Sequence, residues 1–396
     1  MAGLEDYRWL VSPSGVEAIQ SASELLQAKD VFAATTLLRR IYSPSQTHLA
    51  LEQAQLRVKA RGKFSHADRI FFTDVALQQA TSETIACYKA SRFPVGKPIH
   101  DLCCGIGGDL LALASRAPAV GVERDEVTSL LASANCQALG LDNASIEQRD
   151  VTSLSPADMP LVHIDPDRRP QGRRTTRVEL HEPGEAFLES LIEHCEGGAI
   201  KLAPAAQIPD GWNAQVEQEW ISDEGECKQL IVWLGSLVVQ PGRKVATALS
   251  SDGSRHESFT AEEDKALPIA AEALGDYIYE PDPAVIAAGL VSEIAAQEGL
   301  SQLSAGVAYL TGDVKTGSPM LTAFEVIDQT AMDIKRVKAM LIPHDVGRIE
   351  IKKRGVDVQP EQLQRQLKTD GAQRATLIIT PLNGRAIAVL TQRLTK

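Results

Sequence analysis

The chain has 396 residues, 44% of them hydrophobic, which is enough for two or three domains with buried cores and excludes a disordered protein. Its net charge of −12 excludes attraction to nucleic acid through overall charge and leaves that role to local basic patches. The six cysteines lack CxxC spacing, the first residues carry charges, and no apolar run approaches the ~18 residues of a membrane span. We therefore expect a cytoplasmic protein with reduced thiols.

Residues 1–98 predict a helical domain. Ser14-Gly-Val-Glu17 matches a capping box, which marks a helix start, and leucines at helical spacing support a later helix that ends at Arg61-Gly62. The polar segment from Phe72-Thr73 to Thr81 has two interpretations. Either its threonines cap short helices, or the segment closes over a cofactor.

The central feature of the chain is Ile99–Asp109, which reads Ile-His-Asp-Leu-Cys-Cys-Gly-Ile-Gly-Gly-Asp. Its apolar start predicts a strand, its glycines a tight turn, and the apolar pattern that follows a helix. Gly105 and Gly107 allow positive φ and let a ligand approach the bare backbone. We expect a nucleotide-like ligand at this turn.

The chemistry of the turn distinguishes between two such ligands. Leu110 occupies the position where the dinucleotide fingerprint G-x-G-x-x-G requires its third glycine. Asp101, four residues before the first glycine, suits a cationic amino group and would repel a pyrophosphate. S-adenosylmethionine carries an ammonium and a sulfonium but no phosphate, so it is the cofactor that the turn predicts.

Three further strands follow in regular alternation with helices, which is typical of a doubly wound parallel sheet. An acid follows each of them: Glu123, Asp150 and Asp165. A helix cap explains any one of these acids. Together with Asp101, however, they lie at the sheet edge where such folds bind ligands. We expect Glu123 to accept from both ribose hydroxyls and Asp150 from the adenine amino group. The predicted cofactor-binding set is Phe72, Thr73, Thr81, Asp101, Cys103, Gly105, Gly107, Glu123, Arg124, Asp150 and Val151.

Later elements are predicted in the same way. A fifth strand covers 199–204, and a hairpin follows with strands near 216–222 and 229–234. Asp282 and Pro283 start one helix that runs through Ile294. From about Leu321 the pattern is strand, helix, strand, helix and two strands joined by a turn at Asn383-Gly384, which is a compact α+β module.

These motifs resemble those of a known protein family. Asp101–Asp109, Glu123, Asp150 and Asp165-Pro166 resemble motifs I to IV of class I S-adenosylmethionine-dependent methyltransferases. Together with 71–81, 277–285 and 349–355, they are similar to bacterial members that end in a THUMP-like domain, and more distantly to trimethylguanosine synthases. The similarity covers the chain from about Arg61 onward.

The resemblance implies a Rossmann-like α/β sheet with an N-terminal helical domain and a C-terminal α+β THUMP-like module. The expected domains are 1–98 (helical), 99–260 (S-adenosylmethionine-binding), 261–320 (helical connector) and 321–396 (THUMP-like). THUMP domains of other enzymes are associated with RNA binding, so the module is expected to bind RNA. A stabilising or protein-interaction module is the alternative.

Asp165-Pro166-Asp167-Arg168 follows the fourth strand. It resembles the [D/N/S]-P-P-[aromatic] motif of methyltransferases that act on exocyclic amines, in which the acid and the first proline carbonyl accept the protons of the amine. Asp167 and Arg168 replace the second proline and the aromatic residue. A guanidinium can stack on a base or hold a phosphate, so Asp165, Pro166 and Arg168 are the predicted catalytic residues.

The segment 168–177 contains five arginines in ten residues, which indicates binding to phosphates or to an acidic substrate unless it is only a solvated loop. Arg169, Arg173, Arg174 and Lys201 are the predicted substrate-binding residues, although a lysine in the position of Lys201 commonly reaches to solvent. His100 and His163 lie in buried strands without metal-ligand spacing, which favours core histidines and no metal site.

Three functions remain open. The first is an S-adenosylmethionine-dependent methyltransferase that acts on RNA at a base amino group. The second is a methyltransferase of a small molecule or a protein, which the overall acidity and the missing aromatic residue favour. The third is a non-catalytic RNA-binding protein that keeps the cofactor fold. The oligomeric state does not follow from the sequence.

Overall fold

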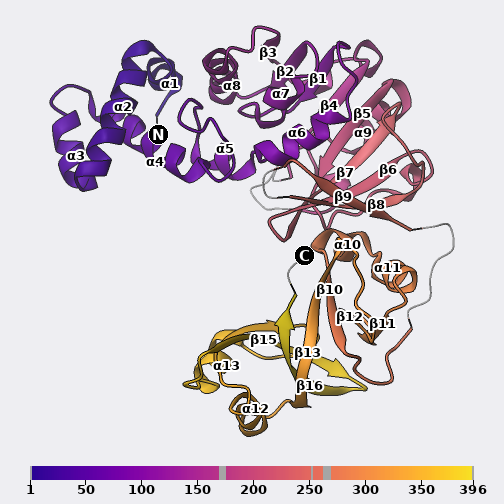
Figure 1. Cartoon of the computed structure of the whole chain (residues 1–396). Helices are drawn as coiled ribbons and strands as arrows, with labels where there is room; N and C mark the ends of the chain where they lie inside the picture. The colour runs from indigo at the N-terminus through magenta and orange to yellow at the C-terminus, as the bar shows by residue number, and fades with distance from the viewer. Residues whose placement is uncertain (1, 169–174, 251–252, 262–268, 395–396) are drawn as a thin grey trace. The chain divides into compact units, whose positions relative to one another are not determined.

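The computed structural model describes residues 2–168, 175–250, 253–261 and 269–394 (Figure 1). The chain divides into two compact units. The first comprises Met1–Gln218, Gln229–Gly242 and Ser251–Ser254, and the second Glu219–Lys228, Arg243–Ser250 and Arg255–Lys396. The four-domain division expected from the sequence stays a prediction.

The N-terminal part of the first unit is helical, as expected. Its helices are α1 (Leu4–Leu10), α2 (Pro13–Ala28), α3 (Val31–Leu38), α4 (Pro44–Ala60), α5 (Asp74–Gln79) and α6 (Glu83–Ser91). The predicted helix end at Arg61 is confirmed. The predicted capping box at Ser14 is wrong, because Ser12 caps α2 by accepting from the Gly15 N–H, and Pro13 occupies the first turn, where a missing N–H costs nothing.

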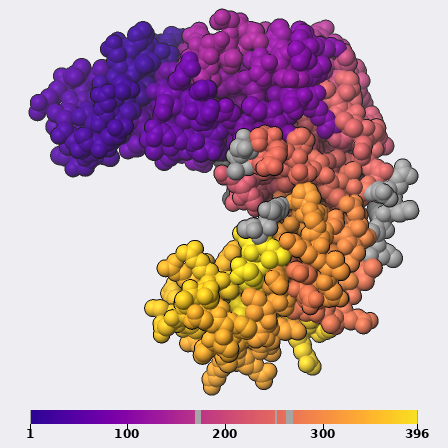
Figure 2. All heavy atoms as spheres, in the orientation of Figure 1, coloured from indigo at the N-terminus to yellow at the C-terminus, as the bar shows by residue number. Residues whose placement is uncertain are grey.

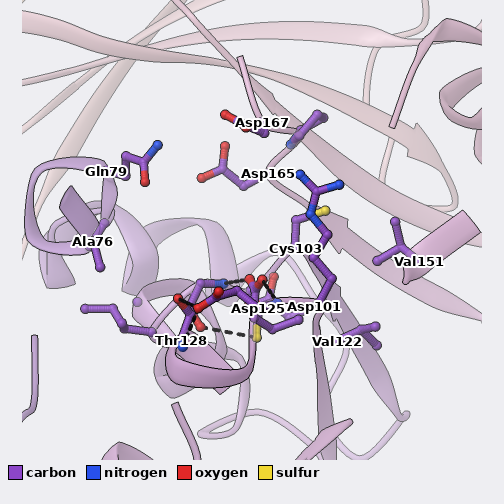
Figure 3. A pocket seen from close by; sticks show the side chains of 18 of the residues that line it. Ala76, Gln79, Asp101, Cys103, Val122, Asp125, Thr128, Val151, Asp165 and Asp167 are labelled. Atoms are coloured by element: carbon purple, nitrogen blue, oxygen red, sulfur yellow. Dashed lines mark hydrogen bonds between the residues drawn. The ribbon is translucent and has the colours of Figure 1, made fainter. Parts of the chain in front are cut away.

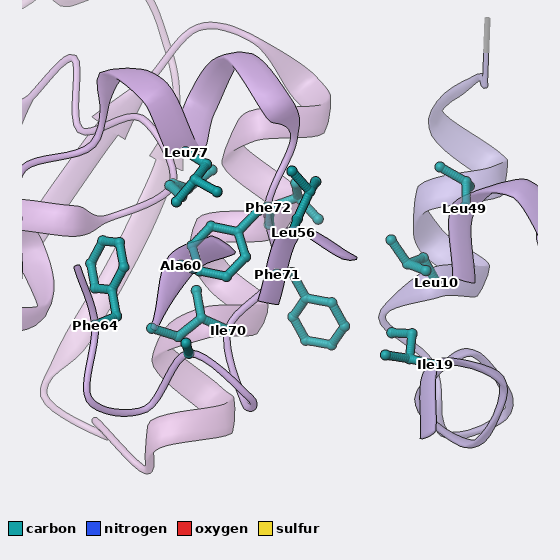
Figure 4. Packing of buried hydrophobic residues seen from close by; sticks show 13 residues of the cluster. Leu10, Ile19, Leu49, Leu56, Ala60, Phe64, Ile70, Phe71, Phe72 and Leu77 are labelled. Carbon is teal, nitrogen blue, oxygen red and sulfur yellow. The ribbon is translucent and has the colours of Figure 1, made fainter. Parts of the chain in front are cut away.

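A buried apolar cluster joins these helices to the rest of the unit. It includes Leu10 of α1, Leu56 of α4 and Phe72 (Figure 4), and it extends to Ile106 in the glycine turn and Leu131 in α8 (Glu126–Leu139). In the space-filling view the indigo helices and the purple segment that follows them form one continuous surface (Figure 2). The N-terminal helices are therefore packed onto the sheet region rather than attached through a linker.

The sheet of the first unit has the order β3-β2-β1-β4-β5-β7, with the first five strands parallel and β7 antiparallel to β5. The order reverses between β1 and β4, which is where doubly wound sheets bind ligands. The predicted parallel strands and the helix that ends at Gly140 are confirmed to within two residues, and β7 begins three residues earlier than predicted. The bounds are β1 (Ile99–Leu102), α7 (Gly108–Leu113), β2 (Ala119–Glu123), α8 (Glu126–Leu139), β3 (Ala144–Gln148), β4 (Leu161–Ile164), α9 (Glu185–His194), β5 (Gly197–Leu202) and β7 (Glu226–Gly235).

Four short 3₁₀ turns complete the first unit: η1 (Val151–Ser153), η2 (Pro156–Asp158), η3 (Val178–Leu180) and η4 (Asp210–Trp212). The predicted hairpin is present as β6 (Glu217–Asp223) and β7, joined by Glu224 and Gly225, both at positive φ. Positive φ at both central residues is what a two-residue hairpin turn requires.

The second unit contains β8 (Lys244–Leu249) and β9 (His256–Thr260) and a seven-stranded sheet in the order β11-β12-β10-β13-β16-β15-β14. The predicted alternation of elements after Leu321 is confirmed. The bounds are β10 (Tyr277–Pro281), α10 (Pro283–Ala288), α11 (Val291–Gln297), β11 (Ser301–Ser304), β12 (Val307–Gly312), β13 (Leu321–Ala331), α12 (Ile334–Leu341), β14 (Val346–Lys353), α13 (Pro360–Gln366), β15 (Gln373–Leu382) and β16 (Arg385–Arg393).

Two expectations for the second unit are wrong. The single helix from Pro283 to Ile294 is broken into α10 and α11, because Gly289 adopts φ +72° and ends the first of them. The connector predicted as helical also contains β10, β11 and β12, which belong to the same sheet as the C-terminal strands. These strands are short, and their apolar and polar residues do not alternate regularly, so the sequence gives no strong strand signal.

Candidate active site

A cavity of about 580 Å³ lies at the C-terminal ends of the parallel strands, within the first unit. Its size is ordinary for a site that holds a cofactor-sized ligand. Gln79 of α5 and Val151 after β3 lie on opposite sides of it, and Asp165 and Asp167 lie together at one end (Figure 3). The predicted site residues that line it are Thr73, Thr81, Asp101, Cys103, Gly105, Glu123, Arg124, Asp150, Val151, Asp165, Pro166, Arg168 and Lys201.

Two of the remaining predicted residues, Phe72 and Gly107, do not line the cavity. Phe72 is a correction: its side chain is 2% exposed in the apolar cluster, its ring packs 5.7 Å from that of Phe64, and its backbone N–H donates to Gln53. Gly107 does not line the cavity but caps α7 with φ +90°, which continues the turn. Arg169, Arg173 and Arg174 lie outside the described residues.

The glycine turn is joined to the end of β2 through Glu123. The Gly105 N–H donates to one carboxylate oxygen of Glu123 at 3.0 Å, and the Asp125 N–H donates to the other at 3.0 Å. Gly105 has φ +58°, and a Cβ added there would meet only open space, so its conformation rather than crowding requires glycine. Glu123 is thus fixed in orientation, and each oxygen retains a lone pair for a further donor.

A buried group of polar side chains lies beneath the turn. His163 of β4 contacts Asp101 of β1, with 2.7 Å between Nδ1 and Oδ1, and the Lys89 ammonium lies 3.0 Å from His163 Nε2. Because an ammonium only donates, Nε2 is the acceptor and the proton of His163 is on Nδ1, which donates to Asp101. Among the described residues, the second oxygen of Asp101, Oδ2, has no hydrogen-bond partner although it is buried. Burial raises the pKa of Asp101.

Asp109, in the first turn of α7, is the anion at the centre of this group. Its Oδ1 lies 2.7 Å from the Lys89 ammonium, and its Oδ2 accepts from the Thr81 hydroxyl at 2.7 Å. Burial opposes the charge on Asp109, but the ammonium groups of Lys89 and Lys201 outweigh it and lower the pKa of Asp109. Burial lowers the pKa of Lys89. Sequence reasoning missed Lys89 and Asp109, although a lysine inside the apolar run 85–90 is a signal of a buried partner.

Lys201, at the end of β5, faces Asp165, at the end of β4, with 2.5 Å between the ammonium and Oδ2. The alternative that Lys201 reaches to solvent is wrong, because the residue is only 7% exposed. Burial opposes its charge, but Asp165 and Asp109 outweigh that effect and raise the pKa of Lys201. Two buried lysines, Lys89 and Lys201, therefore share Asp109 as a counter-charge.

In the polar segment before α6, one of the two threonines has the predicted capping role, and closure over a cofactor stays a prediction. Thr73 caps α5 by accepting from the Ala76 N–H at 3.1 Å, as the capping interpretation expects. Thr81 does not cap a helix, because its hydroxyl donates to Asp109. Both threonines also line the cavity.

Asp150 and Arg124 lie on the other side of the cavity and already have protein partners. One Asp150 oxygen accepts from the N–H and the hydroxyl of Thr152, and these bonds lower the pKa of Asp150. Arg124 forms a two-bond ion pair with Glu182, at 2.6 and 3.3 Å. The half-exposed pair contributes at most about 1 kcal/mol, so its main effect is to fix the rim of the cavity.

The charges that line the cavity fit a cationic ligand. Among the described residues, eight acids and four basic residues line it, and the buried Oδ2 of Asp101 has no donor in this set. An ammonium group would satisfy that oxygen, and the bare backbone at Gly105 leaves room for an adenosyl group. The acids are Asp101, Asp109, Glu123, Asp125, Asp150, Asp165, Asp167 and Glu182, and the basic residues are Arg124, Arg149, Arg168 and Lys201.

His163 is buried, as predicted for a core histidine, but its hydrogen bonds make it part of the site rather than a metal ligand. No group of three or more His, Cys, Asp or Glu side chains in the described part of the chain is arranged to hold a metal ion. None of the helices within those residues combines the length and the apolar character needed to cross a bilayer.

Two family models match parts of the chain. Residues 321–393 match a THUMP domain-like family, in agreement with the predicted C-terminal module. Residues 3–60 match a domain of unknown function, which covers α1 to α4. Neither match includes the cavity.

Relatives of known class cover nearly the whole chain. Uncharacterized S-adenosylmethionine-dependent methyltransferases from two strains of Mycobacterium tuberculosis are 33% identical to it over 354 residues, which is 86% of this chain and 94% of theirs. A crystal structure assigned as a Porphyromonas gingivalis methyltransferase has the same fold, with a TM-score of 0.77 at 19% identity, over 99% of this chain and 98% of that one. The identity, the coverage and the cavity agree: this chain belongs to the S-adenosylmethionine-dependent methyltransferase family.

Proposed function

We propose that this methyltransferase acts on RNA, at an amino group of a base. The observation that carries the proposal is the state of Asp165 at the end of the cavity. One oxygen of its carboxylate is held by Lys201, and among the described residues its other oxygen has no partner. Pro166 follows directly and lines the cavity, and its carbonyl would supply the second acceptor for the two protons of an amine.

The proposed cofactor residues line the same cavity. Asp101 would bind the ammonium group through its unpartnered oxygen, Glu123 the ribose hydroxyls and Asp150 the adenine amino group. When bound, S-adenosylmethionine supplies a methyl group on a sulfonium, and the nucleophile forms a C–N bond as the C–S bond breaks toward sulfur. The protein contributes binding and orientation, which is the main requirement of a direct displacement.

Asp165 and Pro166 would accept hydrogen bonds from the two N–H groups of the amine and so orient its lone pair toward the methyl group. After transfer the nitrogen carries a positive charge and loses one proton, for which the Asp165 carboxylate is the nearest proposed acceptor. Arg168, which lines the same end of the cavity, would stack on the base or bind a phosphate.

Basic residues support an RNA rather than a small-molecule substrate. The sequence has five arginines between 168 and 177. In the second unit, Arg348 of β14 and Arg374 of β15 are direct partners across the strand pair and, with Arg393, line a hollow of about 470 Å³. Like charges directly opposite one another destabilise a sheet, so their retention favours an anionic ligand.

Not every basic residue of the C-terminal module supports this role. Lys352 and Arg354 both pair with Glu280, at 2.7 and 3.4 Å. Arg393 likewise lies 4.0 Å from Glu350. The basic face that we assign to RNA is therefore defined by Arg348 and Arg374. All six cysteines are free, which agrees with the proposed cytoplasmic location.

Transfer of tritium from labelled S-adenosylmethionine tests the proposed substrate. Total bacterial RNA, a bacterial protein extract and a small-molecule extract are incubated separately with the wild type and with Asp165→Asn. We expect label in RNA with the wild type, recovered in a nucleoside methylated at an exocyclic nitrogen by mass spectrometry. Label in the protein or small-molecule fraction alone would instead establish the alternative methyltransferase function.

A further inference from the structure

Protein stability does not explain why a lysine, Lys201, lies in the cavity. It is 7% exposed, and removing an ammonium from water costs several kcal/mol unless a partner offsets it. Replacing a buried ion pair with apolar residues of similar size is commonly neutral or stabilising. A buried lysine at the floor of a ligand cavity therefore has a use other than holding the fold together.

The contacts of Lys201 point to that use. Its only hydrogen-bond partner among the described residues is Asp165, which lies beside it because β4 and β5 are adjacent parallel strands. Asp165 itself is a quarter exposed, with 28% of its side chain accessible, so it would be free to rotate without this bond. Lys201 thus fixes an acid that faces the cavity.

Asp109 keeps Lys201 charged from the other side. Together with Asp165 it raises the pKa of Lys201 against the effect of burial, so the ammonium is a permanent donor at neutral pH. Asp109 is in turn held by Lys89 and Thr81. These buried contacts fix Asp109, so its charge favours the ammonium form of Lys201 before any ligand binds.

We propose that Lys201 is a positioning residue for methyl transfer: it holds Oδ2 of Asp165 so that Oδ1 faces the nucleophile. This inference rests on the proposed function, because it requires Asp165 to orient the substrate amine. A carboxylate held through one oxygen accepts along a fixed direction through the other, whereas a freely rotating one aligns the amine only part of the time.

A double-mutant cycle tests the proposal. The variants are Lys201→Met, Asp165→Asn and the double variant, and the control is Lys97→Met, which removes a lysine paired with Glu196 away from the cavity. Dissociation constants for S-adenosylhomocysteine and single-turnover methyl transfer to RNA are measured for each, and thermal melting confirms folding. Lys201→Arg keeps the charge and provides a second variant should Lys201→Met not fold.

We expect Lys201→Met to slow transfer about 30-fold or more while cofactor affinity stays within about twofold of the wild type. In the Asp165→Asn background the same change has no further effect, because an N–H group already replaces the oxygen that would face the nucleophile. Lys201→Arg recovers part of the rate.

Three outcomes would overturn the inference. Equal losses of rate in both backgrounds would show that Lys201 acts independently of Asp165, and unchanged transfer in a folded Lys201→Met would show that it does not act at all. If the wild type binds S-adenosylhomocysteine but methylates no RNA, the proposed function fails first and the role of Lys201 falls with it. That result is distinct, because it appears before any variant is compared.

Discussion

His163 donates its Nδ1 proton to Asp101 across 2.7 Å, between two side chains that are each 1% exposed. Lys89 determines the direction of this bond, because its ammonium occupies Nε2 of His163 and can only donate. One oxygen of Asp101 is thereby satisfied inside the protein, and the other is left for a ligand. Through Asp101, the buried His163 is therefore linked to the proposed binding of the cofactor.

Replacing His163 with Leu is expected to weaken cofactor binding. The change removes the donor to Asp101 and the acceptor for Lys89, so Asp101 loses its fixed orientation. We expect S-adenosylhomocysteine affinity to fall about 10-fold and the free energy of unfolding to fall by about 2–3 kcal/mol. Calorimetric titration and denaturant unfolding measure the two effects. His194→Leu, at an exposed position of α9, is the control, and equal affinities for the two variants would contradict the role of His163.

The cofactor affinity is expected to fall in acid. Burial raises the pKa of Asp101, and only its ionised form attracts an ammonium group, so affinity is complete above that raised pKa and is lost as the pH drops through it. The raised pKa also means that ionised Asp101 lowers the free energy of unfolding at neutral pH. Protonation in acid removes this cost, so stability rises as the pH falls while cofactor affinity decreases. Asp109, whose pKa Lys89 and Lys201 lower despite burial, stays ionised.

Titrations of S-adenosylhomocysteine between about pH 5 and 8 check this dependence. The Asp101→Asn variant serves as the control, since it removes the group that titrates. An affinity that falls in acid to the same extent in both proteins would assign the dependence to another residue.

Thr81→Val is expected to destabilise the protein without changing its shape. Valine matches threonine in size but leaves Asp109 Oδ2 without the hydroxyl that it accepts from at 2.7 Å. Because Asp109 is buried and charged, we expect a loss of about 1.5–3 kcal/mol in the free energy of unfolding. Thr36→Val in α3, where an exposed hydroxyl donates to a backbone carbonyl, should change it by less than about 0.5 kcal/mol. Denaturant unfolding of the two variants shows whether the hydrogen bond from Thr81 to Asp109 stabilises the fold.

Reversing the charge of Arg348 and Arg374 is expected to weaken RNA binding. Each arginine that contacts a phosphate adds about one unit to the slope of log affinity against log salt concentration, so the double change to Glu should lower that slope by about two. Filter binding at several salt concentrations measures it. The matched control reverses Arg39 and Arg40, which are exposed in the N-terminal region. The same loss in both double variants would indicate an effect of net charge alone.

Most of the first sheet could be predicted, because strong local signals agree with the tertiary fold there. The strand 119–123 and the helix that ends at Gly140 have clear apolar periods and a left-handed glycine stop. The break at Gly289 and the strands β10 to β12 were not predicted. Their short segments take their structure from the sheet they join, which local sequence does not reveal.

Some features of the candidate site could likewise be predicted from the sequence, and others could not. Asp101, Glu123, Asp150 and Asp165 were predicted from their positions after strands, and all line one cavity. The pairing of Lys201 with Asp165 and of Lys89 with Asp109 was not, because it joins residues from separate elements. Sequence spacing carries no information on such contacts. Phe72 was misassigned since an aromatic residue beside a polar segment has the same pattern whether it faces a ligand or the core.

The most direct measurement is the calorimetric titration of S-adenosylhomocysteine into the wild type and into Asp101→Asn at neutral pH. Asparagine preserves the acceptor for His163 but turns an N–H toward the ligand in place of the unpartnered oxygen. We predict saturable binding at one site in the wild type and an affinity lower by about 30-fold in the variant, with similar melting temperatures. Equal affinities, or no binding to the wild type, would contradict the assignment of this cavity as the cofactor site.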